Sequence, residues 1–237
     1  MNFTDQVVMV TGASGNLGSA VAQAFSALGA QLVLVERHVD TLQGVLAADG
    51  AAGAAPLLLA ADLLDPVQVD GAVGAAIARF GRIDVLCNLA GGFRMGEAVH
   101  ETSASTWDFL FDLNARTVVH TAKAVVPHML KQGGGRIVNV GAFAAQKGAA
   151  QMGAYIASKS AVIRLTESMA AELREKGINV NCVLPTIIDT PENRAAMPDA
   201  DPARWVAPDD LANAIVFLAS TQARAIHGAA LPVTALS

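Results

Sequence analysis

The sequence is poor in charge, in aromatic rings and in cysteine. Of 237 residues, 16% are charged and 5% are aromatic, and there are two cysteines. Long hydrophobic runs are missing too: a membrane-spanning helix needs about 20 mostly apolar residues, and charged residues or histidines interrupt every long apolar stretch. The first residues carry no cationic cluster, so we expect no signal peptide. Cys87 and Cys182 lie in apolar stretches, which predicts buried thiols in a reducing, cytoplasmic protein.

Apolar residues, in contrast, make up 53% of the chain. This content excludes intrinsic disorder, which is typical of low hydrophobicity. Sixteen cationic residues against 21 acidic ones give a net charge of −5, which disfavours non-specific binding to nucleic acid. A chain of this length can bury a substantial core, and no linker or repeat divides it. We predict a single domain over residues 1–237, without a nucleic-acid or membrane partner.

Short apolar stretches alternate with longer segments of helical period. The stretches are nearly continuous and rich in Val, Ile and Leu, which is typical of strands buried on both faces of a parallel sheet. The predicted strands are Gln6–Val10, Gln31–Val35, Pro56–Ala61, Ile83–Leu89, Arg136–Val140, Asn179–Leu184 and Ala229–Val233. The predicted helices are Gly15–Leu28, Val39–Ala48, Val67–Phe80, Ser105–Lys131, Tyr155–Lys176 and Pro208–Ser220. This alternation predicts an α/β fold: a Rossmann-type, doubly wound parallel sheet of seven strands between two helical layers.

Two segments lack such a period. Gly50–Ala55 is rich in glycine and alanine and is predicted to be a short loop before a strand. Thr190–Val206 contains three prolines, and a long irregular loop in a compact domain is often a functional lid. We therefore expect a substrate lid at about 190–206.

The first predicted strand runs into a glycine-rich turn that opens the first helix. Glycines there allow a tight turn, a close approach of the backbone to a pyrophosphate, and close packing of helix on sheet. The free N–H groups of the helix N-terminus also favour an anion. The position between strand and helix favours a dinucleotide site over a plain connection. The predicted cofactor-binding residues of this turn are Gly12, Ser14, Gly15, Asn16, Leu17 and Gly18.

Glu36 and Arg37 follow the second predicted strand and indicate opposite cofactors. An acid at the end of this strand accepts hydrogen bonds from the adenosine ribose hydroxyls and repels a 2′-phosphate, whereas an arginine binds that phosphate. Because Glu36 comes first after the strand, we favour NAD(H) over NADP(H) and include both residues among the cofactor contacts.

Tyr155 is the only tyrosine, and Lys159 follows it by four residues. On a helix this spacing puts both side chains on one face. A phenol has a pKa near 10 and is a poor base at neutral pH, and a nearby ammonium lowers that pKa. The pair is therefore a candidate proton-transfer site, although a tyrosine and a lysine at this spacing are also common on exposed helices.

These motifs and several others resemble those of the short-chain dehydrogenase/reductase family, and they follow one another along the whole chain in the order typical of that family. They are the turn at Thr11–Gly18, Asp62-Leu63 after the third strand, Asn88-Leu89-Ala90-Gly91 after the fourth, Asn114, Tyr155-x-x-x-Lys159, Pro185 and Thr190. The resemblance implies that Tyr155 donates or accepts a proton. It implies that Lys159 holds the nicotinamide ribose and lowers the phenol pKa, and that Asn114 anchors a water linking Lys159 to solvent.

The same resemblance implies the remaining cofactor contacts and the assembly. Asp62 would contact adenine with Leu63 beside it, and the carboxamide would meet Ile188 and Thr190. Asn88, Ala90 and Gly91 would line the ribose and phosphates, and Pro185 would precede the nicotinamide segment. The family pairs its two longest helices across subunits, which implies a homodimer or homotetramer.

Three positions depart from the family pattern. The middle glycine of the turn normally lies where this chain has Asn16, and we expect the turn to form because asparagine tolerates positive φ. The catalytic serine normally lies 13 residues before the tyrosine, at Ala142 here, and losing one oxyanion donor typically costs about 10²–10³ in rate. Ser158 and Ser160, on the tyrosine helix, are poor replacements. The usual Pro-Gly after the sixth strand is Pro185-Thr186.

The second and third departures resemble one branch of the family, the dihydropteridine reductases. These have Gly-Ala in place of the serine and a segment much like Leu184–Trp205 after the sixth strand. Reduction of a quinonoid pterin adds a hydride and a proton to a conjugated C=N system, so no alkoxide forms and the serine has less to do. A quinone or an imine substrate fits Ala142 equally well.

Four residues are candidates for substrate contact: Ala142, Phe93, Met152 and Trp205. Phe93 and Met152 could line a pocket for a flat substrate or simply belong to the core. The five histidines show no metal-binding spacing, and we predict no metal site.

The sequence thus predicts an NAD(P)-dependent oxidoreductase that moves a hydride between nicotinamide and a small carbonyl or conjugated C=N substrate, with proton transfer by Tyr155 and Lys159. The alternatives within the family are a ketone, 3-oxoacyl or quinone reductase. An alternative of another class is a non-catalytic dinucleotide sensor, suggested by the missing serine.

Overall fold

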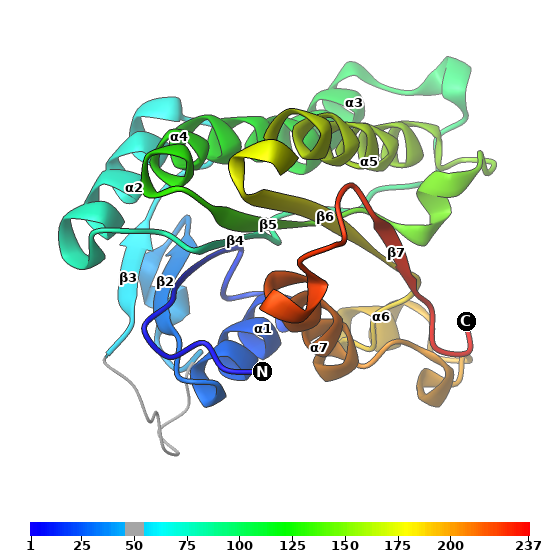
Figure 1. Ribbon diagram of the computed structural model, residues 1–237. Helices are drawn as coiled ribbons and strands as arrows, with labels where there is room; N and C mark the ends of the chain where they lie inside the picture. Colours follow the sequence, from blue (N-terminus) through cyan, green and yellow to red (C-terminus); the bar gives the residue numbers. More distant parts are fainter. Residues whose placement is uncertain (46–54) are drawn as a thin grey trace.

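Seven strands form one parallel sheet in a computed structural model of the chain, which describes residues 1–45 and 55–237. The strands are β1 (Val7–Thr11), β2 (Gln31–Glu36), β3 (Leu57–Ala60), β4 (Val85–Asn88), β5 (Gly135–Val140), β6 (Ile178–Pro185) and β7 (Ala230–Val233). Their order across the sheet is β3-β2-β1-β4-β5-β6-β7 (Figure 1). The predicted parallel, doubly wound sheet is confirmed.

The strand order reverses between β1 and β4. From β1 the chain steps outward to β2 and β3, and then returns to place β4 on the other side of β1. In sheets of this kind ligands bind outside the carboxyl ends of the strands at such a switch point. The sequence segments that follow β1 and β4 therefore meet at the place where a ligand is expected.

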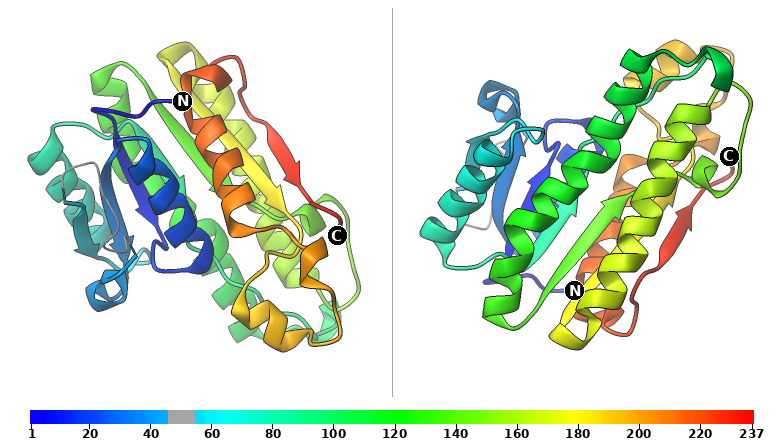
Figure 2. Two further views of the ribbon diagram at one scale, coloured as in Figure 1. Left: turned by 90° about the horizontal axis from the view of Figure 1, so that it is seen from below. Right: turned by 90° about the horizontal axis from the view of Figure 1, so that it is seen from above.

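Two helical layers cover the sheet. The helices are α1 (Asn16–Ala27), α2 (Pro66–Phe80), α3 (Ala104–Phe111), α4 (Thr117–Gln132), α5 (Gly153–Leu173), α6 (Pro191–Ala196) and α7 (Pro208–Ala219). Figure 2 shows α1 and α7 on one face, and α4 and α5 side by side on the other. In β1, Val8 and Val10 pack toward the α1 and α7 side, and Val7 and Met9 toward the other. Burial on both faces explains why β1 is almost continuously apolar.

Local sequence signals set the helix ends. Asp65 caps α2 by accepting a hydrogen bond from the backbone N–H of Val67, and Pro66 is the first helical residue. Gly81, with φ of 77°, ends the same helix, and Gly133, with φ of 86°, ends α4. Glycine adopts this left-handed conformation at little cost, which makes these ends predictable.

Two predicted helices differ from the structure. The segment Ser105–Lys131 is not one regular helix: α3 and α4 are joined by a π-helical turn, Asp112–Arg116. Such turns are rare and occur frequently at functional sites, and this one contains Asn114. Of the predicted helix Val39–Ala48, the structure shows a 3₁₀ turn at Val39–Leu42. Its end and the predicted loop Gly50–Ala55, apart from its last residue, lie outside the described residues.

Both cysteines are free and buried, as predicted. Among the described residues, no helix combines the length and the apolar character needed to cross a membrane.

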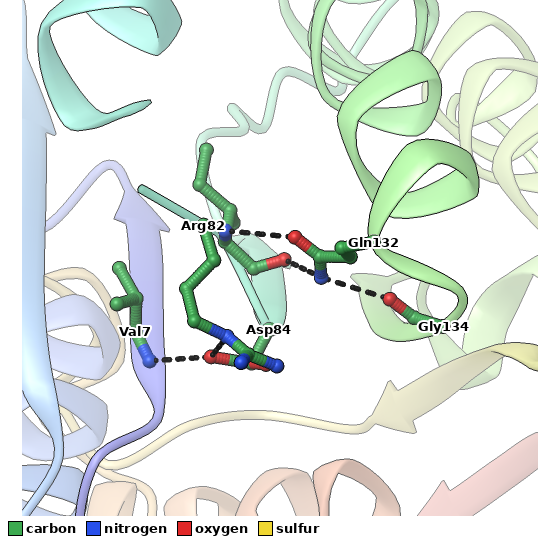
Figure 3. A network of polar contacts seen from close by, with 6 residues as sticks. Val7, Arg82, Asp84, Gln132 and Gly134 are labelled. Carbon is green, nitrogen blue, oxygen red and sulfur yellow. Dashed lines mark hydrogen bonds and ion pairs between the residues drawn. The ribbon is translucent and has the colours of Figure 1, made fainter. Parts of the chain in front are cut away.

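A buried carboxylate ties the strands together at the end of the sheet opposite the switch point (Figure 3). Asp84 accepts a hydrogen bond from the backbone N–H of Val7 at 2.9 Å and from Arg82 Nε at 2.9 Å. Arg136 lies nearby: burial lowers the pKa of its guanidinium, and Asp84 acts against this shift. Gln132 closes the network by donating to the carbonyls of Ile83 and Gly134.

We expect Asp84→Ala to lower the free energy of unfolding by about 2 kcal/mol, because the substitution leaves the buried backbone N–H of Val7 without an acceptor. The partly buried Arg136 guanidinium would also lose the favourable charge of Asp84 nearby. Denaturant titration measures the change. The control is Glu167→Ala, which breaks an exposed pair with Arg164 and should cost less than about 1 kcal/mol. Equal losses in the two variants would contradict the role of Asp84.

Candidate active site

The turn between β1 and α1 is built so tightly that two of its glycines cannot carry a side chain. A Cβ at Gly18 would lie 2.1 Å from the carbonyl oxygen of Gly12. Gly12 has φ of 65°, and a Cβ there would lie 2.8 Å from the backbone nitrogen of Ala90. At Gly15 the nearest atom would be 3.4 Å away, so this residue is not needed to close the turn.

Asn16 is the first residue of α1. It is not among the described non-glycine residues with positive φ, so our reason for expecting the turn to form was wrong. Asn16 fits because it adopts helical backbone geometry, not because asparagine tolerates a left-handed one.

The N-terminus of α1 has no side-chain cap. Its N-cap, Gly15, has no side chain, and no acidic residue lies in the first turn. The first N–H groups of a helix have no partner within it, and they carry a partial positive charge. The turn therefore offers hydrogen-bond donors that suit a phosphate.

Glu36 closes the other side of this turn. Its carboxylate accepts hydrogen bonds from Ser14 Oγ at 2.8 Å and from the backbone N–H of Arg37 at 2.9 Å. These bonds fix the carboxylate at the carboxyl end of β2, whereas the Arg37 side chain is exposed.

A pocket lies at the switch point, beside Glu36. Six predicted cofactor residues line it: Gly12, Glu36, Arg37, Asp62, Leu63 and Ala90. Its other lining residues are Val35, Ala61, Leu64, Leu113 and Thr117, which sequence reasoning missed. They are apolar or small residues at ends of strands and on helices, and nothing in their local sequence distinguishes them from core positions.

Asn88, at the end of β4, is buried rather than open to this pocket. It donates to Asn139 Oδ1 and accepts from Thr121 Oγ1, both at 2.8 Å. Asn139 in turn donates to Thr166 Oγ1 at 2.9 Å. This chain of buried side chains joins α4, β4, β5 and α5, so Asn88 holds the strands in register beneath the site.

Asn114 joins the loop after β4 to α5. Its side chain accepts from the backbone N–H of Gly92 at 2.8 Å, and donates to the Gly92 carbonyl at 3.1 Å and to Ser158 Oγ at 3.0 Å. It is 1% exposed. A Cβ at Gly91 would lie 3.0 Å from Asn114 Oδ1 and 3.1 Å from Lys159 Nζ. The predicted residues 91, 114 and 159 therefore lie together.

Lys159 is buried, and its ammonium donates to the carbonyl of Val140, at the end of β5, at 2.9 Å. Burial lowers the pKa of Lys159 to about 8, and Cys182 acts in the opposite direction. An ammonium held next to Gly91 and the end of β5 lies at the centre of the candidate site.

Tyr155 lies in the first turn of α5, one turn before Lys159, and is half-buried. Its ring meets the ring of Phe93 edge to face, with 4.8 Å between centroids. Burial raises the pKa of Tyr155 to about 12. In this structure burial, and not the expected effect of Lys159, sets the direction of the phenol pKa, so the phenol is protonated at neutral pH.

No hydroxyl replaces the absent serine in the loop after β5. Ala142 is buried directly beyond the end of β5. Ser158 Oγ donates to the carbonyl of Tyr155 at 2.8 Å, and Ser160 Oγ donates to the carbonyl of Ala145 at 3.0 Å. Both hydroxyls therefore donate to backbone carbonyls of the chain.

The expected lid is more regular than its sequence indicates. It contains α6 and a 3₁₀ turn at Pro202–Arg204, and the Thr190 hydroxyl caps α6 by accepting from the backbone N–H of Asn193. The base of the segment is closed by two bonds, Asp189 N–H to Val206 O and Val206 N–H to Ile187 O. Trp205 is 6% exposed, so little of its ring is open to a substrate. Phe93, at 55%, is far more accessible.

Comparisons with known proteins agree with this geometry. A family model described as short chain dehydrogenase matches residues 6–201. The D-threitol dehydrogenase of Mycolicibacterium smegmatis is 35% identical, over 96% of this chain and 91% of its own length. A short-chain type dehydrogenase/reductase from Mycobacterium ulcerans superposes with a TM-score of 0.94 at 29% identity, covering 100% of this chain and 90% of the other.

A neighbour solved with cofactor is carveol dehydrogenase from Mycobacterium avium in complex with NAD. It is 27% identical with a TM-score of 0.86, and the match covers 98% of this chain and 97% of the other. The glycine turn, the pocket at the switch point and the Tyr155–Lys159 pair thus occur in a fold that binds a nicotinamide cofactor. The chain belongs to the short-chain dehydrogenase family and is an oxidoreductase.

Proposed function

We propose that the protein uses NAD(H) to interconvert a small carbonyl or conjugated C=N compound with its reduced form, and that Tyr155 exchanges the proton. The observation that carries the proposal is the cluster on α5 and β5. A protonated phenol lies one helical turn from a buried ammonium, which is itself held by the carbonyl of Val140.

The residues present fit a dinucleotide. The turn excludes side chains at Gly12 and Gly18 and leaves the N-terminus of α1 uncapped, which suits a pyrophosphate. Glu36 would hold the adenosine ribose, Asp62 would lie at the adenine, and Lys159 would hold the nicotinamide ribose. When bound, the nicotinamide supplies or accepts the hydride.

The side chains of the site would hold the substrate and move one proton. At neutral pH the phenol of Tyr155 carries its proton, because burial raises its pKa to about 12, so it is ready to donate in the direction of reduction. The Lys159 ammonium stabilises the phenolate left behind. Asn114 holds this part of α5 in place, because it binds Ser158, which lies between Tyr155 and Lys159, and the backbone of Gly92.

The absence of a hydroxyl at Ala142 favours a substrate that develops little oxyanion charge. A conjugated C=N bond, such as that of a quinonoid dihydropterin, gains a hydride and a proton without forming an alkoxide. Phe93 is a candidate contact for such a flat molecule, because 55% of its surface is exposed and its ring lies against Tyr155. We therefore propose a dihydropteridine-reductase-like activity, with Ala142, Phe93 and Met152 at the substrate.

The test is a screen with NADH of quinonoid dihydropterin, quinones, imines and ketones. We expect turnover of the pterin, and no gain from Ala142→Ser with that substrate. Turnover confined to ketones, with a gain of about 10² from Ala142→Ser, would contradict the pterin proposal but leave the oxidoreductase intact.

A second candidate is oxidation of a polyol or secondary alcohol, or reduction of the matching ketone. It is favoured by the D-threitol dehydrogenase, which is 35% identical over nearly the whole chain. The same screen, run also with NAD⁺ and D-threitol, distinguishes the two candidates.

Cofactor choice depends on Glu36. We expect NADH to bind at least about tenfold more tightly than NADPH, because the fixed carboxylate repels a 2′-phosphate. Fluorescence titration gives both dissociation constants. Glu36→Ala should bring the two constants closer together, whereas the control Asp70→Ala, which removes an exposed charge from α2, should not. Tighter binding of NADPH by the unaltered protein would show that Arg37 decides.

We propose a homodimer or homotetramer, formed through the helical layer of α4 and α5. Val119 and Leu130 of α4 and Trp107 of α3 are large apolar residues with more than a third of their surface exposed. Light scattering after size-exclusion chromatography measures the mass, and a monomer at micromolar concentration would contradict the proposal.

A further inference from the structure

One hydrogen bond joins the lid to the glycine turn. Asn16, the first residue of α1, donates from Nδ2 to Glu192 Oε2, in α6, at 2.9 Å. The two residues are 176 positions apart in the sequence, and no sequence motif contains both of them. The bond connects the element expected to hold the phosphates with the element expected to cover the substrate.

The rest of the lid is fastened elsewhere. Arg204 and Leu236 exchange two hydrogen bonds, which tie its far end to the chain after β7. Asn193 donates to the carbonyl of Ile188 at 2.8 Å, and Arg194 pairs with Asp189, so α6 is held to its own base. Among the described residues, one side-chain hydrogen bond joins α6 to the glycine turn, and it is the bond between Asn16 and Glu192.

Glu192 also brings a negative charge to a place that suits phosphate. The first turn of α1 contains no acid of its own. The pKa of Glu192 is lowered by its own backbone N–H, and further by the Thr190 hydroxyl and by Asn16, so the side chain is a carboxylate at neutral pH. A pyrophosphate at this turn would lie near that carboxylate and repel it.

We propose that Asn16 and Glu192 form a latch, which holds α6 against the phosphate-binding turn and slows the exchange of the dinucleotide. The latch positions the lid and takes no part in hydride or proton transfer. The inference rests on the dinucleotide site proposed above and does not depend on the identity of the substrate.

The test is the rate of NADH release, measured by stopped-flow fluorescence during displacement by excess ADP-ribose. A net hydrogen bond of ordinary strength corresponds to a rate change of about threefold to tenfold. We expect Asn16→Ala to release NADH faster by this factor, and Glu192→Ala to release it faster by less, because that substitution also removes the carboxylate that repels the pyrophosphate. The double variant should be no faster than either single one, because both substitutions remove the same contact.

Two further variants separate the latch from other effects. Glu192→Gln loses the charge but keeps an acceptor for Asn16, so release should stay at the rate of the unaltered protein or become slower. Asp199→Ala removes an exposed carboxylate from the same lid and should leave the rate unchanged.

If all variants released NADH at the rate of the unaltered protein, the latch would be overturned. It would also be overturned if the rate increases of the two single substitutions multiplied in the double variant. If the unaltered protein did not bind NADH, the dinucleotide site would fall together with the latch, so the two failures are distinguishable.

Discussion

Tyr155→Phe should reduce kcat by about 10²–10⁴, the usual contribution of a general acid or base. The substitution removes one hydroxyl and keeps the ring. Among the described residues, the phenol hydroxyl makes no hydrogen bond, and the ring contact with Phe93 does not involve it. The folded structure therefore loses nothing, and the deficit should appear in the chemical step alone.

Three measurements separate this result from a general loss of function. The dissociation constant of NADH should change less than about twofold, and the midpoint of thermal unfolding should stay within about 2 °C. The control Ser168→Ala removes a hydroxyl from the exposed face of the same helix and should keep full activity. A Phe variant with most of its turnover would show that another group, or water, carries the proton.

The parallel sheet could be predicted from the sequence because each of its strands leaves a strong local signal. β1 is buried at every residue and is apolar up to Thr11, as burial on both faces requires. β6 is also buried throughout although it contains Asn179 and Asn181, because both side chains donate to the carbonyl of Ile226. Helix ends at Asp65, Gly81 and Gly133 follow from capping chemistry. The π turn around Asn114 could not be predicted, because nothing in the local sequence distinguishes it from a regular helix; its residues contact α5 in the folded chain.

The residues of the site also fall into those that the local sequence predicts and those that depend on the fold. Gly12, Glu36, Tyr155 and Lys159 belong to motifs with fixed spacing, so the sequence points to them and the structure brings their elements to one edge of the sheet. The link between Asn16 and Glu192 depends on how two distant segments meet, which no spacing rule encodes. The phenol pKa depends on burial as well as on Lys159, and burial is a property of the fold.

Lys159→Met should lower kcat by at least about 10², because the phenolate left after proton transfer would lose its neighbouring positive charge. The same substitution should not destabilise the fold at pH 7. Methionine fills a similar volume without a charge, whereas the ammonium is buried and its pKa is lowered to about 8 from 10.5. This shift corresponds to a cost of about 3 kcal/mol at most for keeping the charged form in the folded state.

The sign of this cost can be tested through pH. Between about pH 8 and pH 10.5 the unfolded chain binds the lysine proton and the folded protein has lost it, so the stability of the unaltered protein rises with pH in this window and the full cost applies below it. The Met variant lacks this titration. Burial raises the pKa of Cys182 to about 11 and that of Tyr155 to about 12, so both groups stay protonated in the two folded proteins up to pH 9.5 and contribute nearly equally to both. Denaturant titrations at pH 7 and pH 9.5 should therefore show the unaltered protein gaining stability relative to the variant. A variant that is several kcal/mol less stable at pH 7 would mean that the bond from the ammonium to the Val140 carbonyl outweighs its desolvation, and that Lys159 supports the fold as well as the chemistry.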